Sequence, residues 1–206
     1  TSVALVYGYL NSFYYNVEFY IPDRYKEGYG ISKQGIDSAH NSDVKLIIAL
    51  DCGIKSVALV AYAKELGIDF IICDHHRPAD TIPEAVAVLD PKRKDCNYPF
   101  KELSGCGIGF KLLQALEDQL TESPKGAVDY LDLVAVSIAA DIVPIVGENR
   151  ILAHFGLKCL SEKPSSGLKA LIHLAGIKNK LSITGVVFGL APRINAAGRI
   201  GHANSA

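Results

Sequence analysis

Long apolar runs and methionine are missing from this sequence. None of its hydrophobic segments approaches the roughly 18 residues that a membrane-spanning helix needs, so no membrane partner is predicted. The apolar N-terminus, TSVALVYGYLNSFYY, lacks the basic stretch and the cleavage site of a signal peptide. Methionine is absent from all 206 residues, an initiator included. The chain is therefore expected to be part of a longer gene product.

Cysteine is scarce and shows no ligand spacing. The five cysteines are odd in number and contain no C-x-x-C pair, which argues against a zinc site. Cys52 and Cys73 end apolar runs, where a small buried thiol is ordinary. This usage indicates a reducing compartment and predicts a cytoplasmic protein.

Negative charge is nearly missing from the C-terminal quarter of the chain. Residues 151–206 carry seven Lys and Arg but a single acid, Glu162, whereas residues 1–150 carry 14 basic and 21 acidic side chains. The net charge of −1 hides this asymmetry. It suggests an acidic part that holds metal and a part that meets an anion. A solvated basic surface would explain the charge equally well.

The pattern of apolar residues predicts an α/β fold. Apolar runs at 44–51, 69–74 and 85–90 have the composition of buried strands, and 17–21 is a further short strand. The amphipathic stretch 55–67 predicts a helix that stops at Gly67. Strands that are almost continuously apolar and separated by helices are typical of a parallel sheet covered on both faces.

From about residue 107 the pattern becomes helical. Apolar residues recur at helical spacing in 107–120, 127–143, 149–162 and 166–176. We expect an α/β domain over residues 1–160, a parallel sheet flanked by helices. A helical connecting segment over 161–206 would lead towards a second domain, and SEKPSSG marks the junction.

Two of the predicted strands end in the same way, with an aspartate. IIALD ends at Asp51, and FIICD ends at Asp74 and continues into His75 and His76. Ligands bind outside the carboxyl ends of the strands in open parallel sheets, so these side chains should converge at one edge. Asp51 alone could equally cap a helix. Capping does not explain two adjacent imidazoles.

The two histidines are expected to have different roles. Neighbouring side chains on an extended strand point to opposite sides, so His75 and His76 should not bind one metal together. One would bind metal while the other faces a substrate oxygen. Carboxylates with one imidazole suit Mn²⁺ or Mg²⁺ better than Zn²⁺. A further acid, Asp141 in SIAADIVPIVGEN, interrupts an apolar helix, where metal ligation or pairing with an arginine would offset the cost of burial.

Five ordered motifs carry a family resemblance. ALDCG, ICDHHRP, SGCGIGFKLLQAL, AADIVP and PRINAAGR, with RYKEGYGIS near the start, resemble the DHH phosphoesterase superfamily. They are most similar to its RecJ family of exonucleases, and the resemblance runs through essentially the whole chain. It implies a metal-dependent phosphodiesterase that degrades single-stranded DNA 5′→3′ to mononucleotides in DNA repair and recombination. Single-strand-binding protein and helicase partners are implied as well.

The resemblance also implies roles for individual residues. Asp51 would bridge two Mn²⁺ or Mg²⁺ ions, with His75 and Asp141 as further ligands. Asp74 would support the site, and His76 would contact the scissile phosphate or assist the leaving group. The family's first motif, D-x-D, would stand immediately before TSVALVY. Without it, residues 1–206 are expected to bind metal poorly and to hydrolyse little, and the full parent would be the enzyme.

Nucleic-acid contacts are expected from two segments. Arg24 lies on a Gly-flanked loop, and Arg193, Asn195 and Arg199 lie in the small-residue segment PRINAAGRIGHA. The resemblance supports phosphate contacts there, whereas the residues alone favour ordinary ion pairs. Tyr25 and Tyr29 would stack bases or merely pack. The Gly-x-Gly-x-Gly run in SGCGIGF favours close helix packing over a phosphate cradle.

Two other functions stay open. A DHH phosphodiesterase acting on short oligoribonucleotides or cyclic dinucleotides would share the metal site and differ in its substrate contacts. A non-catalytic nucleic-acid-binding fragment would use the basic C-terminal part as its docking surface.

Overall fold

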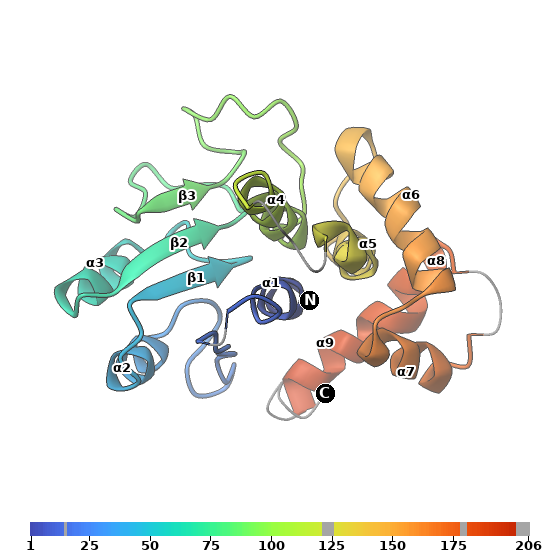
Figure 1. The fold of residues 1–206 in the computed structure, drawn as a ribbon, viewed down its shortest axis with the longest axis horizontal. Coiled ribbons are helices and arrows are strands. Elements are labelled where there is room, and N and C mark those ends of the chain that lie inside the picture. Colours follow the sequence, from blue (N-terminus) through green and yellow to red (C-terminus); the bar gives the residue numbers. More distant parts are fainter. Residues whose placement is uncertain (15, 121–125, 178–180, 201–206) are drawn as a thin grey trace.

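The computed structural model describes residues 1–14, 16–120, 126–177 and 181–200, and of residues 197–200 the backbone alone. Within this part of the chain, three parallel strands form one sheet in the order β1–β2–β3. They are β1 (Leu46–Leu50), β2 (Asp69–Cys73) and β3 (Ala87–Leu89). Figure 1 shows this sheet at one end of the molecule and a group of helices at the other.

The described helices surround and extend the sheet. In chain order they are α1 (Ser2–Leu10), α2 (Lys33–Asn41), α3 (Val57–Glu65), α4 (Gly105–Glu117), the 3₁₀-helix η1 (Ala127–Tyr130), α5 (Leu131–Ala140), α6 (Gly147–Glu162), α7 (Ser166–Leu174), α8 (Ile183–Gly185), the π-helical turn η2 (Val186–Leu190) and α9 (Ala191–Ile200). None of them is long and apolar enough to cross a membrane.

The sheet is covered on both faces, as predicted. Side chains alternate along a strand, so Phe70 and Ile72 of β2 pack into one apolar cluster with residues of α2 and α3. Ile71 and Cys73 contact the larger cluster, which contains residues of α1 and α4. Burial on both faces explains why the strands are apolar at nearly every position.

Helix α5 is the centre of the larger cluster. Every residue from Leu131 to Ala139 is buried, because α5 packs against α1, α4, α6 and η2. Gly156 permits the close approach of α6: a Cβ there would lie 2.3 Å from the Leu131 carbonyl oxygen. The same cluster continues through Leu168 and Leu190. The division of the chain at residue 160 stays a prediction.

A proline explains the π-helical turn. Pro192 has no N–H, and its ring crowds the carbonyl of Phe188, four residues before it, so an α-helical turn cannot continue there. The chain instead takes one wider turn, η2, and then resumes as α9. The Arg193 guanidinium donates to the Gly189 carbonyl oxygen over 2.6 Å.

Two local predictions differ from the structure. Residues 17–21 form no strand, and Phe19 and Tyr20 stay about half exposed, because no neighbouring strand pairs with this segment and Pro22 follows it. Helix α2 is absent from the sequence-based prediction, since KQGIDSAHN is polar and contains a glycine. It forms because the Ser32 side chain accepts from the Gly35 N–H (2.9 Å) and Ile36 inserts into the core.

Candidate metal centre

The strand register brings the predicted acids to one edge of the sheet. Leu50 pairs with Cys73, and the Asp51 N–H donates to the Cys73 carbonyl oxygen over 2.8 Å. Asp51 adopts a left-handed backbone (φ 63°), an uncommon conformation for a non-glycine residue and one that ends the strand abruptly. It does not cap helix α3, whose N-cap is Ser56. The capping alternative for Asp51 is therefore wrong.

Asp74 is buried, and its carboxylate holds the turn at this edge through hydrogen bonds. It is 1% exposed. Its Oδ1 accepts from the backbone N–H groups of His75 (2.8 Å) and His76 (3.2 Å), and its Oδ2 accepts from the Ile54 N–H (2.9 Å). The His76 Nδ1 lies 2.7 Å from Oδ1. Burial alone would raise the pKa of Asp74, but the hydrogen bonds from Ile54 and His76 outweigh it and lower the pKa. The carboxylate therefore stays ionised and fixes the turn.

His75 faces Asp51. Its Nε2 lies 3.1 Å from Asp51 Oδ1, and its side chain is 13% exposed. Burial lowers the pKa of His75, but the nearby Asp51 carboxylate outweighs burial and raises it overall. Asp51 Oδ1 is nevertheless buried without a hydrogen bond of acceptable geometry. The contact brings opposite charges together but leaves a lone pair of Asp51 Oδ1 available to a ligand.

The two imidazoles lie side by side. Their ring centroids are 4.6 Å apart in an edge-to-face arrangement, and Asp51, His75 and His76 each offer one ligand atom within 4.8 Å of the others. The expectation that the two side chains point to opposite sides is wrong, because β2 ends at Cys73 and the following residues turn around the Asp74 carboxylate. The division of roles between the histidines stays a prediction.

Asp141 ends helix α5 rather than interrupting it. It is the C-cap residue, and its carboxylate accepts from the Ser137 hydroxyl over 3.1 Å. The residue as a whole is exposed, yet desolvation by the surrounding atoms raises the pKa of its carboxyl, and the negative charge of Asp51 raises it further. No arginine of the described chain pairs with it. Ile142, directly after it, has a left-handed φ of 53°.

Helix α4 begins directly against Asp51. A Cβ on Gly105 would lie 2.0 Å from Asp51 Oδ1, and a Cβ on Gly109 would lie 3.2 Å from a methyl group of Val6. Close packing is the preferred interpretation of the Gly-x-Gly-x-Gly run, and Gly109 confirms it. The contact of Gly105 with the candidate metal ligand goes beyond that prediction, since spacing alone does not say which strand end faces the helix.

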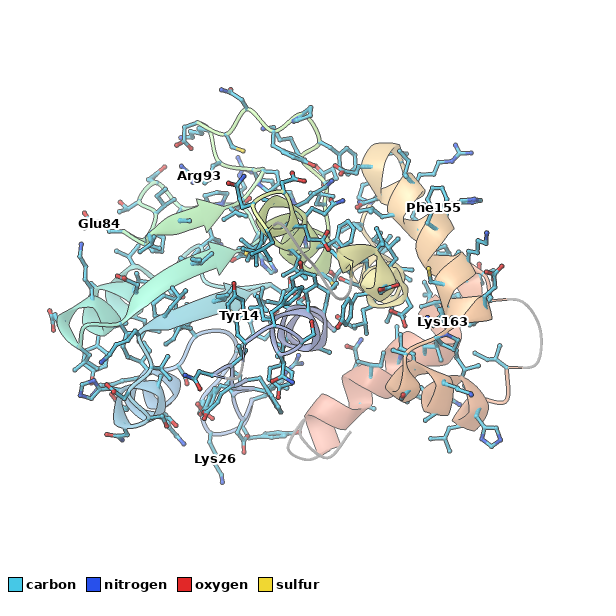
Figure 2. All side chains as sticks on the ribbon, viewed as in Figure 1. Tyr14, Lys26, Glu84, Arg93, Phe155 and Lys163 are labelled. Atoms are coloured by element: carbon cyan, nitrogen blue, oxygen red, sulfur yellow. The ribbon has the colours of Figure 1, made fainter. Side chains whose placement is uncertain are left out.

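The loop before α2 lies beside the candidate centre. The Arg24 guanidinium carbon is 5.5 Å from the centroid of the Tyr29 ring, and the Tyr29 hydroxyl is 3.5 Å from the Asp51 carbonyl oxygen. Burial of the hydroxyl and the Asp51 charge raise the pKa of Tyr29 to about 12, although the ring is exposed overall. Tyr25 is 79% exposed. Lys26, on the same loop, points out to solvent (Figure 2).

A groove connects the end of α5 with α9. It has a volume of about 410 Å³. Its lining comes from the segment around Asp141, from η2 and from the first turns of α9, and consists of Ala139, Ala140, Ile142, Val187, Ala191, Pro192, Asn195 and Ala196. Arg193 and Asn195 are exposed. The side chain of Arg199 lies outside the described residues.

The comparison with protein-family models decides the family. Residues 1–138 match the DHH family, N-terminal domain. The chain belongs to the DHH family. Its α/β fold with a parallel sheet is the one predicted from the sequence.

Several relatives of this DHH-family chain are single-stranded-DNA-specific exonucleases. RecJ of Bacillus subtilis is 44% identical over 207 residues, which cover 100% of this chain and 26% of that protein. RecJ of Escherichia coli is 39% identical, over 90% of this chain and 34% of that protein. The chain thus spans between a quarter and about a third of the length of these relatives.

Solved RecJ structures share the fold. A crystal structure of exonuclease RecJ bound to manganese has a TM-score of 0.86 and 34% identity, and covers 98% of this chain and 51% of that one. RecJ from Thermus thermophilus in complex with Mn²⁺ has a TM-score of 0.81 and 30% identity, over 98% of this chain and 28% of that one.

The edge of this DHH-family sheet fits a divalent cation. Asp51 Oδ1 is buried without a hydrogen bond, although His75 Nε2 lies 3.1 Å from it, and a second imidazole nitrogen, from His76, lies within reach. The negative charge of Asp141 acts on the same group. Carboxylates combined with imidazole, and no thiolate in the cluster of described residues, suit Mn²⁺ or Mg²⁺.

Sequence reasoning missed one acid at this edge. Asp90 follows β3 as Asp51 follows β1 and Asp74 follows β2, and it is 2% exposed. The signal was visible in the sequence, because AVAVLD ends like the other two strands. A lone aspartate after a short strand is most often a turn residue, however, so the pattern alone does not single out Asp90.

Proposed function

We propose that the protein is a Mn²⁺- or Mg²⁺-dependent exonuclease that degrades single-stranded DNA 5′→3′ to mononucleotides, in repair and recombination. The observation that carries the proposal is the convergence of Asp51, His75 and His76 at the carboxyl edge of the sheet. It occurs in a chain similar over 98% of its length to an exonuclease RecJ bound to manganese.

The proposed ligands are Asp51, His75 and Asp141. A divalent cation bound there would lower the pKa of a water molecule and polarise a phosphoryl oxygen. Asp51 has the unpartnered oxygen that such a cation needs. The left-handed backbone at Asp51 and at Ile142 aims the neighbouring carboxylates at the cost of local strain.

His76 and Asp74 act on the substrate side. The Asp74 carboxylate holds His76 through Nδ1 at 2.7 Å, so the His76 Nε2 is left to face a ligand, and the side chain is 48% exposed. In its protonated form His76 donates from Nε2 to a phosphate oxygen or to the leaving oxygen. The contact between Nδ1 and the Asp74 carboxylate keeps the ring in place.

Cations around the centre position the strand. Arg24 beside Tyr29 and the exposed Arg193 provide contacts to phosphates, with Asn195 and Arg199 on the same helix. Phosphate contacts fix the register of a nucleic acid without reading its sequence. An exonuclease that accepts any single strand needs contacts of this kind.

The proposed location is the cytoplasm, and the proposed protein partners are a single-strand-binding protein and a helicase. The location is supported by five cysteines that are all free thiols. The partners are implied by the resemblance and by a substrate that such proteins generate or cover.

The test is a digestion with the full-length protein that contains residues 1–206. Single-stranded DNA labelled at either end, the same DNA as a duplex, a short oligoribonucleotide and a cyclic dinucleotide are each incubated with Mn²⁺. We expect mononucleotides released from the 5′ end of the single strand, and none with Asp51→Ala. Asp43→Ala is the matched control, because Asp43 is an exposed aspartate with the same left-handed backbone (φ 59°).

Other outcomes would overturn the proposal. Turnover of the oligoribonucleotide or the cyclic dinucleotide with the DNA left intact would assign the protein to another branch of the DHH family. Binding of Mn²⁺ and DNA without any turnover would favour a non-catalytic binding module.

A further inference from the structure

Asp90 lies abreast of the DHH motif. Cys73 pairs with Leu89 in the parallel register of β2 and β3, and the Asp74 N–H donates to the Leu89 carbonyl oxygen over 3.0 Å. Because neighbouring strands lie about 4.8 Å apart, Asp90 stands beside Asp74 at the edge that carries His75. It comes from the third strand and belongs to none of the proposed ligands.

The Asp90 carboxylate has an unexplained oxygen. Oδ1 accepts from the Lys92 N–H over 2.8 Å, but Oδ2 is buried without a partner. The cations that follow along the chain are engaged elsewhere: the Lys92 ammonium lies 3.7 Å from Glu102, and the Arg93 guanidinium binds Asp95. Burying a carboxylate oxygen without a hydrogen-bond donor costs folding free energy. We therefore expect a donor for Asp90 Oδ2 at the edge of the sheet.

His75 has a complementary unexplained atom. Its Nε2 faces Asp51, whereas its Nδ1 is buried without a partner. An imidazole that binds metal through Nε2 carries its proton on Nδ1. Such an imidazole almost always donates this N–H to a carboxylate, a carbonyl or a water molecule, which fixes the ring.

The Asp74 carboxylate, by contrast, is already hydrogen-bonded through both oxygens. Asp74 Oδ1 already accepts from two backbone N–H groups and from the His76 ring, and Asp74 Oδ2 accepts from the Ile54 N–H. The charge of His75 acts on Asp90 as well as on Asp51. Asp90 is thus the buried carboxylate of this edge that retains an acceptor for His75.

We propose that Asp90 is the positioning residue of His75, accepting through Oδ2 from Nδ1–H across one ordered water molecule, since the two atoms make no direct hydrogen bond or ion pair. This inference rests on the proposed metal centre and deepens it. A single assignment satisfies two buried atoms, one directly after β3 and one in the turn after β2. It also fixes the tautomer of His75, so that Nε2 is the nitrogen available to the cation.

The first test measures Mn²⁺ affinity by calorimetry in the full-length protein. Asp90→Ala should weaken binding by roughly 10- to 100-fold, the usual effect of losing the partner of a metal-binding histidine. Asp90→Asn keeps an acceptor oxygen and should bind at nearly wild-type affinity. Asp95→Ala is the matched control on the same loop, since Asp95 is exposed and pairs only with Arg93. Unchanged affinity in folded Asp90→Ala would overturn the inference.

The second test reads the tautomer of His75, first in the wild type and then in Asp90→Ala. In ¹⁵N-histidine spectra of the wild type with Mg²⁺, His75 Nδ1 should carry the proton, and Asp90→Ala should shift its resonance. A Nδ1 without a proton in the wild type overturns the inference even if Asp90→Ala does not fold. A wild type that binds no Mn²⁺ overturns the proposed function itself, whereas normal wild-type binding with normal binding by Asp90→Ala overturns the role of Asp90 alone.

Discussion

Two buried aspartates in this protein have opposite surroundings. Asp132, in the first turn of α5, is 1% exposed, and its two oxygens accept from the backbone N–H groups of Leu133 (2.8 Å) and Ser165 (2.7 Å). Asp90, at the carboxyl edge of the sheet, is buried to the same degree but keeps one oxygen without a donor. Asp132 connects α5 to the start of α7 by hydrogen bonds, whereas Asp90 Oδ2 can still accept a hydrogen bond from a further donor.

The same contrast extends to the regions around them. The edge of the sheet carries atoms of Asp51, His75 and Asp90 that are buried without a hydrogen bond, and it includes the left-handed Asp51. In the helical region, Asn149 also leaves one oxygen unpartnered, but its amide group donates to the carbonyls of Glu102 and Pro144. Polar groups that are satisfied by backbone indicate a structural role. Clustered unsatisfied ones indicate a ligand.

The largest expected effect is on the candidate metal centre at the edge of the sheet. In Gly105→Ala the new Cβ would stand 2.0 Å from Asp51 Oδ1, so the carboxylate must move. A shift of about 1 Å in such a group costs roughly 100-fold in activity, and Mn²⁺ affinity measured by calorimetry should fall with it. Gly107→Ala is the control, because its nearest neighbour would lie 3.4 Å away. Equal affinities in the two variants would contradict the placement of α4.

The next effect concerns the helical region. Asp132→Ala removes the acceptor of the Ser165 and Leu133 N–H groups, and leaving buried donors unsatisfied costs about 1–3 kcal/mol of unfolding free energy. Urea unfolding measures it, with the exposed Asp129→Ala as control. Mn²⁺ affinity should not change. A loss of metal binding in a folded Asp132→Ala would remove the distinction between the two regions.

A smaller effect concerns bound metal. Mn²⁺ at 100 times its Kd should stabilise the protein by about 2.7 kcal/mol, because only the folded chain assembles the site. Thermal unfolding with and without Mn²⁺ should show an upward shift in Tm for the wild type and none for Asp51→Ala. A shift that survives in Asp51→Ala would mean that the cation binds elsewhere.

The smallest expected effect concerns the nucleic-acid contacts. Arg24→Ala should weaken the binding of single-stranded DNA equally for all sequences. The slope of log K against log salt concentration should fall in magnitude by about 1. Fluorescence anisotropy at several salt concentrations measures this slope. Lys26→Ala is the control, because Lys26 lies two residues away and points out to solvent (Figure 2). Identical slopes in the two variants would show that Arg24 makes no phosphate contact.

The fold and the position of the site follow from local features of the sequence. Apolar runs ending in Asp51 and Asp74 predict parallel strands whose carboxyl ends converge. This prediction works because both strands are buried in the same way and pair in a regular parallel register. The ring orientation of His75 and His76 was beyond such a prediction. It depends on a turn held by the Asp74 carboxylate, and three hydrogen bonds from one side chain to two neighbouring residues leave no periodic trace in the sequence.

Contacts between distant segments were equally hidden. Gly105 meets Asp51 and Asn149 meets Glu102 across separations of about 50 residues, and only the packed structure shows which pairs meet. Helix α2 escaped prediction for a related reason: one buried isoleucine and a serine cap stabilise it, whereas its own composition is polar.

The wide turn η2 determines in which direction around the helix axis the side chains of α9 point. A π-helical turn holds one more residue than an α-helical turn, so Arg193 and Asn195 are advanced by one position around the axis of α9. Deleting one residue within 186–190 would rotate these side chains by about 100° around the helix axis. The direction in which α9 presents Arg193 and Asn195 thus depends on the one extra residue that the wide turn η2 holds.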